Sequence, residues 1–514
     1  MSGYLRRLAT TGAAYTAASI LSKLIAVALL PLYTRHLSPA DYGAAEVMFA
    51  AVVSASIVFR FGVIEALLRF YYKDDEDPAR VVSTSFAALF WTSTAAALLA
   101  LPFAGPISEA LLAEEAADLA RISIGGLWVL TMFEYLLTLF RLEERARAFF
   151  VTTTLSVLVT IAVTVVLVVG EDEGARGLLL GSYATGAAFC LGLIFVQRRR
   201  LSLWVDRGLL RRLLRFGLPT MPAELSLYGL NFVDRIIIVR SVGLAEAGLY
   251  SLAVKFAQAV NVLVRGFQLA WPPLAYSIRD DGEARRAYAL TVTWFVAGCA
   301  FVVTGMWLFA RWIVRALAAP EFFASYEAVG LIATAVTLYA LYMVLLVILG
   351  RTGRTEFNLP ATVAALIANI GLNLALVPPF GIVGAGLALV ASYLVVVALM
   401  YVFSQRLFPV PYEWSRLGRV VVVAAALVGI GELVAPTEGL DGVVVRAVIL
   451  LAYPVVLLAS GFFSDEERGW LARLRHPRQL LARLRAGTDQ RTFDTPTGLP
   501  ESAEVTQLDE DLRP

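Results

Sequence analysis

The sequence predicts an all-α integral membrane protein with about fourteen transmembrane helices. Three observations lead to this prediction. Hydrophobic residues make up 59% of the 514 residues and charged residues only 16%, with a mean hydropathy of +0.73, which is more apolar than a water-soluble fold can bury. Apolar runs near the ~20 residues that span a bilayer recur along the chain. The two halves of the chain also repeat each other.

The same composition excludes several classes of protein. A net charge of +2 is too balanced for a protein that binds nucleic acid by neutralising phosphates. The two cysteines, Cys190 and Cys299, lie in apolar runs, and His36 and His476 are the only histidines. We therefore expect no disulfide framework, no metal site and no cofactor. The chain also has no Walker motif, which disfavours ATP hydrolysis.

Each apolar run is expected to be a helix, because backbone groups in hydrocarbon need hydrogen-bond partners within the chain. The first run is interpreted as a transmembrane helix rather than a signal peptide, since many similar runs follow it. The predicted spans are 12–33, 42–63, 82–102, 122–140, 149–170, 178–196, 217–239, 248–267, 287–309, 329–349, 359–376, 383–403, 420–434 and 443–463.

Lysine and arginine predict the orientation, because short cytoplasmic loops carry the positive excess. Loops that follow even-numbered spans hold twenty-one of these residues, whereas loops that follow odd-numbered spans hold seven, with Arg446 counted at the edge of the last span. We therefore expect both termini in the cytoplasm.

A shift of 205 residues aligns the two halves: Gly43 pairs with Gly248 and Arg60 with Arg265. The shift covers six spans, so both copies keep the same orientation, and such parallel repeats build transporters with a site between two bundles. We predict six-helix lobes at 1–197 and 217–404, joined by a basic amphipathic linker, 198–216, that lies on an anionic leaflet. Two extra helices follow at 405–463, and 464–514 is predicted to be an amphipathic segment with a disordered tail.

Charged side chains inside the spans are candidate site residues, because a charge at mid-bilayer costs at least ~2.5–3.5 kcal/mol. Lys23 lies near the centre of the first span, and Glu224, Asn231 and Arg235 share one face of the seventh. Structural ion pairs remain the alternative, as does snorkelling for arginines near the cytoplasmic ends. The basic and amide candidates are Lys23, Arg60, Asn231, Arg235, Lys255 and Arg265.

The acidic candidates are Glu46, Glu134, Glu224 and Asp234. They either bind a coupling cation or proton, or neutralise the basic residues, and structural pairing is the favoured interpretation. In the eleventh span Asn369 and Asn373 lie one turn apart, a pattern that more often holds helices together than binds substrate.

Six segments of the chain are informative together. They are 32–43 (LYTRHLSPADYG), 216–222 (FGLPTMP), 234–238 (DRIII), 248–253 (GLYSLA), 369–378 (NIGLNLALVP) and 381–386 (GIVGAG). With these segments the chain resembles the polysaccharide or oligosaccharide flippases, of the lipid-linked O-antigen type, within the multidrug/oligosaccharidyl-lipid/polysaccharide exporter superfamily. The resemblance covers nearly all of 12–463. It implies two lobes around a central cavity in a bacterial inner (cytoplasmic) membrane.

The resemblance also implies that undecaprenyl-pyrophosphate-linked oligosaccharide moves from the cytoplasmic to the outer leaflet by alternating access. Lys23, Arg60, Lys255 and Arg265 would then supply cationic donors for the pyrophosphate. The expected partners are the lipid-linked oligosaccharide, membrane lipids, a coupling ion (Na⁺ or H⁺) and polysaccharide-assembly proteins.

Other functions stay open at this point. A multidrug exporter with cationic substrates favours an acidic cavity, which the basic candidates argue against mildly. A peptidoglycan-precursor flippase uses the same pyrophosphate chemistry. A membrane glycosyltransferase or polymerase needs acid/base or metal-binding residues, usually on an external domain, and the outer loop 103–121 has no evident metal-ligand motif. A passive scaffold is disfavoured by the charged faces.

Overall fold

The computed structural model describes residues 28–72, 76–463 and 467. The chain divides into a unit that ends at Tyr453 and a second unit that begins at Pro454, and the following description concerns the first. The described residues form helices joined by turns, with no strand among them. The prediction of an all-α membrane protein is confirmed.

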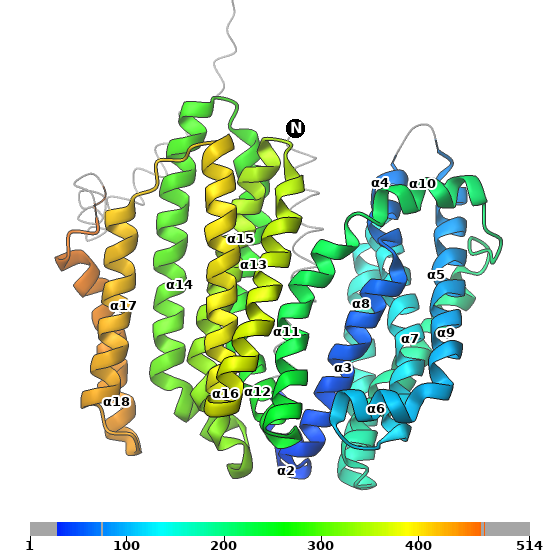
Figure 1. The fold of residues 1–514 in the computed structure, drawn as a ribbon, viewed down its shortest axis with the longest axis horizontal. Helices are drawn as coiled ribbons and strands as arrows, with labels where there is room; N and C mark the ends of the chain where they lie inside the picture. The colour runs from blue at the N-terminus through cyan, green and yellow to red at the C-terminus, as the bar shows by residue number, and fades with distance from the viewer. Residues whose placement is uncertain (1–27, 73–75, 464–466, 468–514) are drawn as a thin grey trace, which may run out of the picture. The chain divides into compact units, whose positions relative to one another are not determined.

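The first group of helices runs from α2 to α9 (Figure 1). α7 packs against α3, α5 and α9, and α8 packs against α9. α3 and α5 begin where the sequence marks a helix start: the side chains of Ser38 and Asp77 accept backbone N–H groups, and a proline follows each. The bounds are α2 Leu30–His36, α3 Pro39–Arg60, α4 Val63–Phe70, α5 Pro78–Ala100, η1 Leu101–Phe103, α6 Ala104–Leu112, α7 Ala117–Leu142, α8 Ala146–Val165, η2 Val166–Gly170 and α9 Gly174–Gln197.

The second group runs from α11 to α18, of which α15 is the most central. α15 packs against α12, α13, α14 and α16, while α11 packs against α16 and α14 against α17. The bounds are α11 Met221–Ser241, α12 Leu244–Ala257, α13 Val260–Ser277, α14 Asp281–Leu317, η3 Pro320–Ser325, α15 Tyr326–Arg351, η4 Thr355–Phe357, α16 Asn358–Leu407, α17 Trp414–Val434 and α18 Gly439–Ala459.

Ten helices in the described part are long and apolar enough to cross a membrane. The first predicted span lies largely outside the described residues. The seventh predicted span corresponds to α11, which carries several charges and is not among the ten. The eighth predicted span is divided between α12 and α13 at Gln258 and Ala259. The eleventh and twelfth both fall within α16. The chain is thus a multi-pass membrane protein, and the count of fourteen stays a prediction.

α16 contains a sharp break at Gly381, which has a left-handed φ of 54°. A Cβ added at Gly384 would lie 2.1 Å from the carbonyl oxygen of Leu376. Residues eight positions apart lie ~12 Å apart in a continuous helix, so the chain must reverse between them. α16 therefore consists of two arms, as the two predicted spans require.

The linker helix α10, Arg207–Gly217, packs against the first group of helices. Its apolar residues Leu209 and Leu213 are buried in a cluster with residues of α4 and α5. Protein therefore covers these two leucines, and contact of the basic residues with an anionic leaflet stays a prediction. Asp206 caps the helix: the backbone N–H of Leu209 and the guanidinium of Arg80 hold the pKa of Asp206 below its usual range.

α3 joins the two groups, because it packs against both α11 and α12. The crossing of α3 and α12 is very close. A Cβ on Gly43 would lie 2.2 Å from the carbonyl oxygen of Leu244, and one on Gly248 would lie 2.0 Å from that of Pro39. These glycines are equivalent positions in the sequence duplication, so the repeat places both small residues at one helix crossing.

Candidate functional site

Arg60, at the end of α3, binds two carboxylates from other helices. Its guanidinium lies 2.7 Å from Glu134 on α7 and 3.0 Å from Glu224 on α11. The Arg60 side chain is only 7% exposed, whereas those of Glu134 and Glu224 are 42% and 41% exposed. The three residues tie α3, α7 and α11 together, and the positive charge of Arg60 is compensated.

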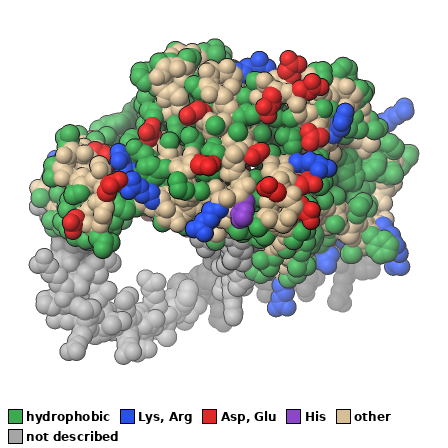
Figure 2. Space-filling view, turned by 90° about the horizontal axis from the view of Figure 1, so that it is seen from below, with side chains coloured by type: hydrophobic (Ala, Val, Ile, Leu, Met, Phe, Trp, Pro, Cys, Tyr) green, Lys and Arg blue, Asp and Glu red, His purple; other side chains and the backbone are tan. Residues whose placement is uncertain are grey.

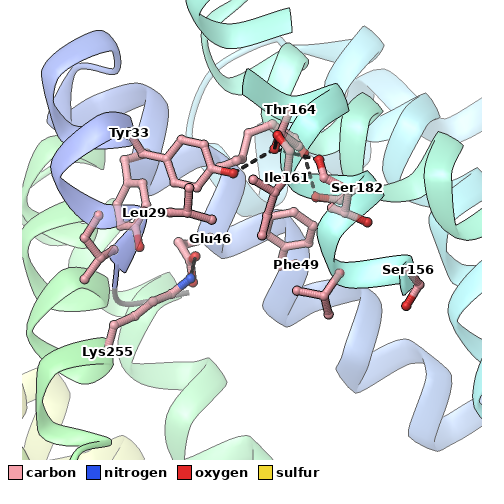
Figure 3. A pocket seen from close by; sticks show the side chains of 14 residues that line it. Leu29, Tyr33, Glu46, Phe49, Ser156, Ile161, Thr164, Ser182 and Lys255 are labelled. Carbon is pink, nitrogen blue, oxygen red and sulfur yellow. Dashed lines mark hydrogen bonds and ion pairs between the residues drawn. The ribbon is translucent and has the colours of Figure 1, made fainter. Parts of the chain in front are cut away.

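A second ion pair joins α3 to α12. Lys255 Nζ lies 2.5 Å from Glu46 Oε1 and 5.7 Å from the centroid of the Tyr42 ring. Figure 3 shows the ammonium of Lys255 directed at the Glu46 carboxylate. Lys255 therefore has a counterion, as Arg60 does.

Asp234 and Arg235 are adjacent on α11 but bind different partners. Asp234 accepts hydrogen bonds from the Tyr250 hydroxyl and from Asn373 Nδ2, each at 2.7 Å. Arg235 donates to Ser251 Oγ at 3.0 Å and to the Asn231 carbonyl oxygen at 2.6 Å. Arg235 is thus held by neutral acceptors.

Unpartnered amide groups belong to the buried cluster around Asp234. Both side-chain polar atoms of Asn369, and Oδ1 of Asn373, lack a hydrogen-bond partner in the described part of the chain. Asn373 links α16 to α11 through its bond to Asp234, and it also donates to the Asn369 carbonyl oxygen at 2.9 Å. A buried carboxylate beside unpartnered amide oxygens is chemically suited to a cation or a proton.

The remaining candidates are separate from these pairs. Arg265 lies on α13, is exposed, and makes no ion pair with any residue that the structure describes. Asn231 Nδ2 lies 3.3 Å from the Tyr393 hydroxyl on α16. Lys23 lies outside the described residues. The described part has no group of three His, Cys, Asp or Glu residues that could hold a metal ion.

A cavity of about 400 Å³ opens beside the Glu46–Lys255 pair, and we call it the chamber. α2, α3, α8, α9 and α12 contribute to its walls (Figure 3). Its polar and aromatic lining includes Tyr33, Glu46, Phe49, Thr160, Ser182 and Lys255.

Sequence reasoning missed the hydroxyl residues of the chamber. Ser156, Thr160 and Thr164 all line it from α8 and recur at every fourth position, so they share one helix face. That periodicity was a usable signal. It is easily passed over, because single hydroxyl side chains often bond back to their own helix, as Thr164 does to the Thr160 carbonyl oxygen.

The chain matches a known protein family and a curated relative. Residues 32–327 match the model of a family described as polysaccharide biosynthesis protein. The succinoglycan biosynthesis transport protein ExoT of Rhizobium meliloti (strain 1021) is 25% identical over 321 residues, which cover 59% of this chain. The match spans 61% of the length of that curated relative.

Solved structures show the same fold. An inward closed conformation of the lipid II flippase MurJ has a TM-score of 0.67 at 14% identity, covering 87% of this chain and 97% of that one. An inward-facing multidrug resistance MATE family transporter of the MOP superfamily has a TM-score of 0.63 at 16% identity, covering 75% and 95%. The chain is thus a multi-pass membrane protein that belongs to the polysaccharide biosynthesis protein family.

Proposed function

We propose that this chain is a flippase, not an enzyme, that moves undecaprenyl-pyrophosphate-linked oligosaccharide from the cytoplasmic to the outer leaflet of a bacterial cytoplasmic membrane. The observation that carries the proposal is Arg235, a buried guanidinium on α11 whose bonds go to Ser251 and to a backbone carbonyl. These two bonds use two of its five N–H donors. Its remaining donors make no ion pair within the described part of the chain, so they can bind an anion.

The pyrophosphate site would use Arg235 and Arg265, with Asn231 beside them. Arg60 and Lys255 stay secondary candidates, because an anion would first have to displace the carboxylates that bind them. Lys23 stays a candidate for binding the pyrophosphate, because it lies near the centre of the first predicted span.

Asp234 is our proposed residue for a coupling ion, Na⁺ or H⁺. Its carboxylate is completely buried and shares its site with the unpartnered amide oxygens of Asn369 and Asn373. Glu46, Glu134 and Glu224 are weaker candidates, because each already neutralises a basic side chain. Ion binding at Asp234 would act on the contact of α11 with α16.

Alternating access would move the lobe 1–197 against the lobe 217–404, while the undecaprenyl chain stays among membrane lipids. Both termini would lie in the cytoplasm, with the extra helices 405–463 attached to the second lobe. Polysaccharide-assembly proteins would receive the product in the outer leaflet.

The proposal is tested in proteoliposomes that contain the full chain. The assay follows a fluorescent undecaprenyl-pyrophosphate oligosaccharide between leaflets, with a cationic dye as the parallel substrate. We expect glycolipid movement without dye movement. Arg265→Ala should slow glycolipid transport about tenfold, as expected for loss of one charge-assisted hydrogen bond.

Arg211→Ala is the matched control, since Arg211 is an exposed arginine on α10. Dye movement without glycolipid movement would overturn the flippase proposal in favour of an exporter. Equal transport by Arg265→Ala and Arg211→Ala would remove Arg265 from the site.

A further inference from the structure

The chamber is electrically balanced, which limits what it can bind. Its two charged side chains, Glu46 and Lys255, neutralise each other at 2.5 Å. A doubly charged pyrophosphate would find no net positive charge there. A neutral ligand that both donates and accepts hydrogen bonds would meet no such penalty.

The polar groups of the chamber suit a polyhydroxyl ligand. Ser182 Oγ donates to the Leu178 carbonyl oxygen at 2.8 Å, so its own lone pairs stay available as acceptors. Thr160 and Tyr33 are half-buried rather than sealed off, so their hydroxyls can exchange hydrogen bonds with a ligand.

Aromatic rings complete the lining. Phe49 and Tyr33 both border the cavity, as Figure 3 shows, and they offer apolar surface to the C–H groups of a sugar ring. A volume of about 400 Å³ is at the lower end of the roughly 300–1,000 Å³ of small-molecule sites. The chamber is therefore suited to a small part of an oligosaccharide rather than to the whole chain.

The chamber also lies next to the proposed pyrophosphate site. Ser251 and Lys255 are one turn apart on α12, and neighbours at this spacing have Cβ atoms ~5–6 Å apart. Ser251 accepts from Arg235, whereas Lys255 lines the chamber. A sugar in the chamber would thus sit close to a pyrophosphate held at Arg235.

We propose that the chamber is a sugar subsite, which binds an uncharged sugar unit of the transported glycolipid through the hydroxyls of Ser182 and Thr160 and the ring of Phe49. This inference rests on the proposed flippase function. It assigns the sugar and the pyrophosphate to separate, adjacent groups of residues.

The test uses the double variant Ser182→Ala/Thr160→Val, which removes two hydroxyls with little change in volume. We expect the apparent KM for the oligosaccharide lipid to rise about tenfold, from two lost hydrogen bonds. Transport of undecaprenyl pyrophosphate without sugar should be unchanged. The control is Ser392→Ala/Thr337→Val: Ser392 is the repeat counterpart of Ser182, and both control hydroxyls bond back to their own helices outside the chamber.

The outcomes separate the two proposals. A wild-type protein that moves no glycolipid contradicts the flippase function itself. Active wild type with equal KM values for the double variant and its control overturns the sugar subsite alone, as does equal slowing of the sugar-free lipid. If the double variant fails to fold, Phe49→Leu, at a half-buried position of the same lining, gives the same comparison.

Discussion

Arg60 and Arg265 occupy equivalent positions in the two halves of the chain, yet their surroundings differ. Arg60 is buried and binds Glu134 and Glu224, whereas Arg265 is exposed and makes no ion pair in the described part. A charge-compensated arginine mainly stabilises helix contacts, while an uncompensated one is available to an anion. The duplication has therefore preserved the residue type in two different surroundings.

The first prediction concerns the stability that Arg60 provides. Arg60→Ala leaves two half-exposed carboxylates without a counterion, so we expect a loss of about 2 kcal/mol, less than the ~3–5 kcal/mol for breaking a fully buried pair. Adding Glu134→Gln and Glu224→Gln should recover most of that loss, because the uncompensated charges disappear. Unfolding in detergent micelles measures both effects.

Arg176→Ala is the control, because the half-exposed Arg176 pairs with Glu173 and Asp118 at the surface and should contribute at most ~1 kcal/mol. If Arg60→Ala matched this control in stability but abolished transport, Arg60 would be a substrate ligand and the structural interpretation would be wrong.

At the level of elements, the sequence predicted helices better than their contacts. Amphipathic spacing in α10 indicated an apolar face, but spacing alone does not say whether lipid or protein covers that face. The structure places Leu209 and Leu213 against α4 and α5. Similarly, helical periodicity placed Glu224 on a polar face, while its partner Arg60 lies 164 residues away and depends on how α3 and α11 are rotated.

The second prediction concerns the α3–α12 crossing. Gly43→Ala should destabilise the protein by about 1–3 kcal/mol, because its Cβ would lie 2.2 Å from a backbone oxygen and neither helix can move aside locally. Gly248→Ala should have a similar effect. Thermal unfolding in detergent provides the measurement.

Gly125→Ala is the matched control, since Gly125 lies in α7 and its added Cβ would meet nothing within 4 Å. That variant should be neutral or slightly more stable, because alanine is the better helix former. Equal stability of the Gly43 and Gly125 variants would show that α3 and α12 do not cross this closely.

At the scale of the whole molecule, composition and apolar runs of bilayer length were enough to predict an all-α membrane protein, because so many apolar residues can be accommodated only in lipid, where the backbone must be helical. The site was predictable only in part. Intramembrane charges could be found along the sequence, but which of them neutralise each other, and which remain free for a substrate, depends on packing between distant helices. Periodicity could have indicated the hydroxyl face of α8, but not the chamber itself, whose walls come from five helices.

The final prediction concerns the orientation of the chain in the membrane, with both termini in the cytoplasm. It follows from the loops after even-numbered spans, which hold twenty-one lysines and arginines, against seven in the loops after odd-numbered spans. Figure 2 views the end of the molecule where α2 and α6 lie, which carries both acidic and basic side chains. Both native cysteines are buried, so Cys190→Ser/Cys299→Ser provides a suitable background for labelling.

In that background, Trp204→Cys should react with a membrane-impermeant maleimide only after the cytoplasmic side is opened. Leu440→Cys should react with the same maleimide in intact cells, provided that the reagent can reach the outer face of the cytoplasmic membrane. Neither position is covered by protein, Trp204 before α10 and Leu440 at the first turn of α18, so we expect the side of the membrane to decide their labelling. The reverse labelling pattern would invert the topology, and the proposed direction of transport would then have to be rederived from the other face.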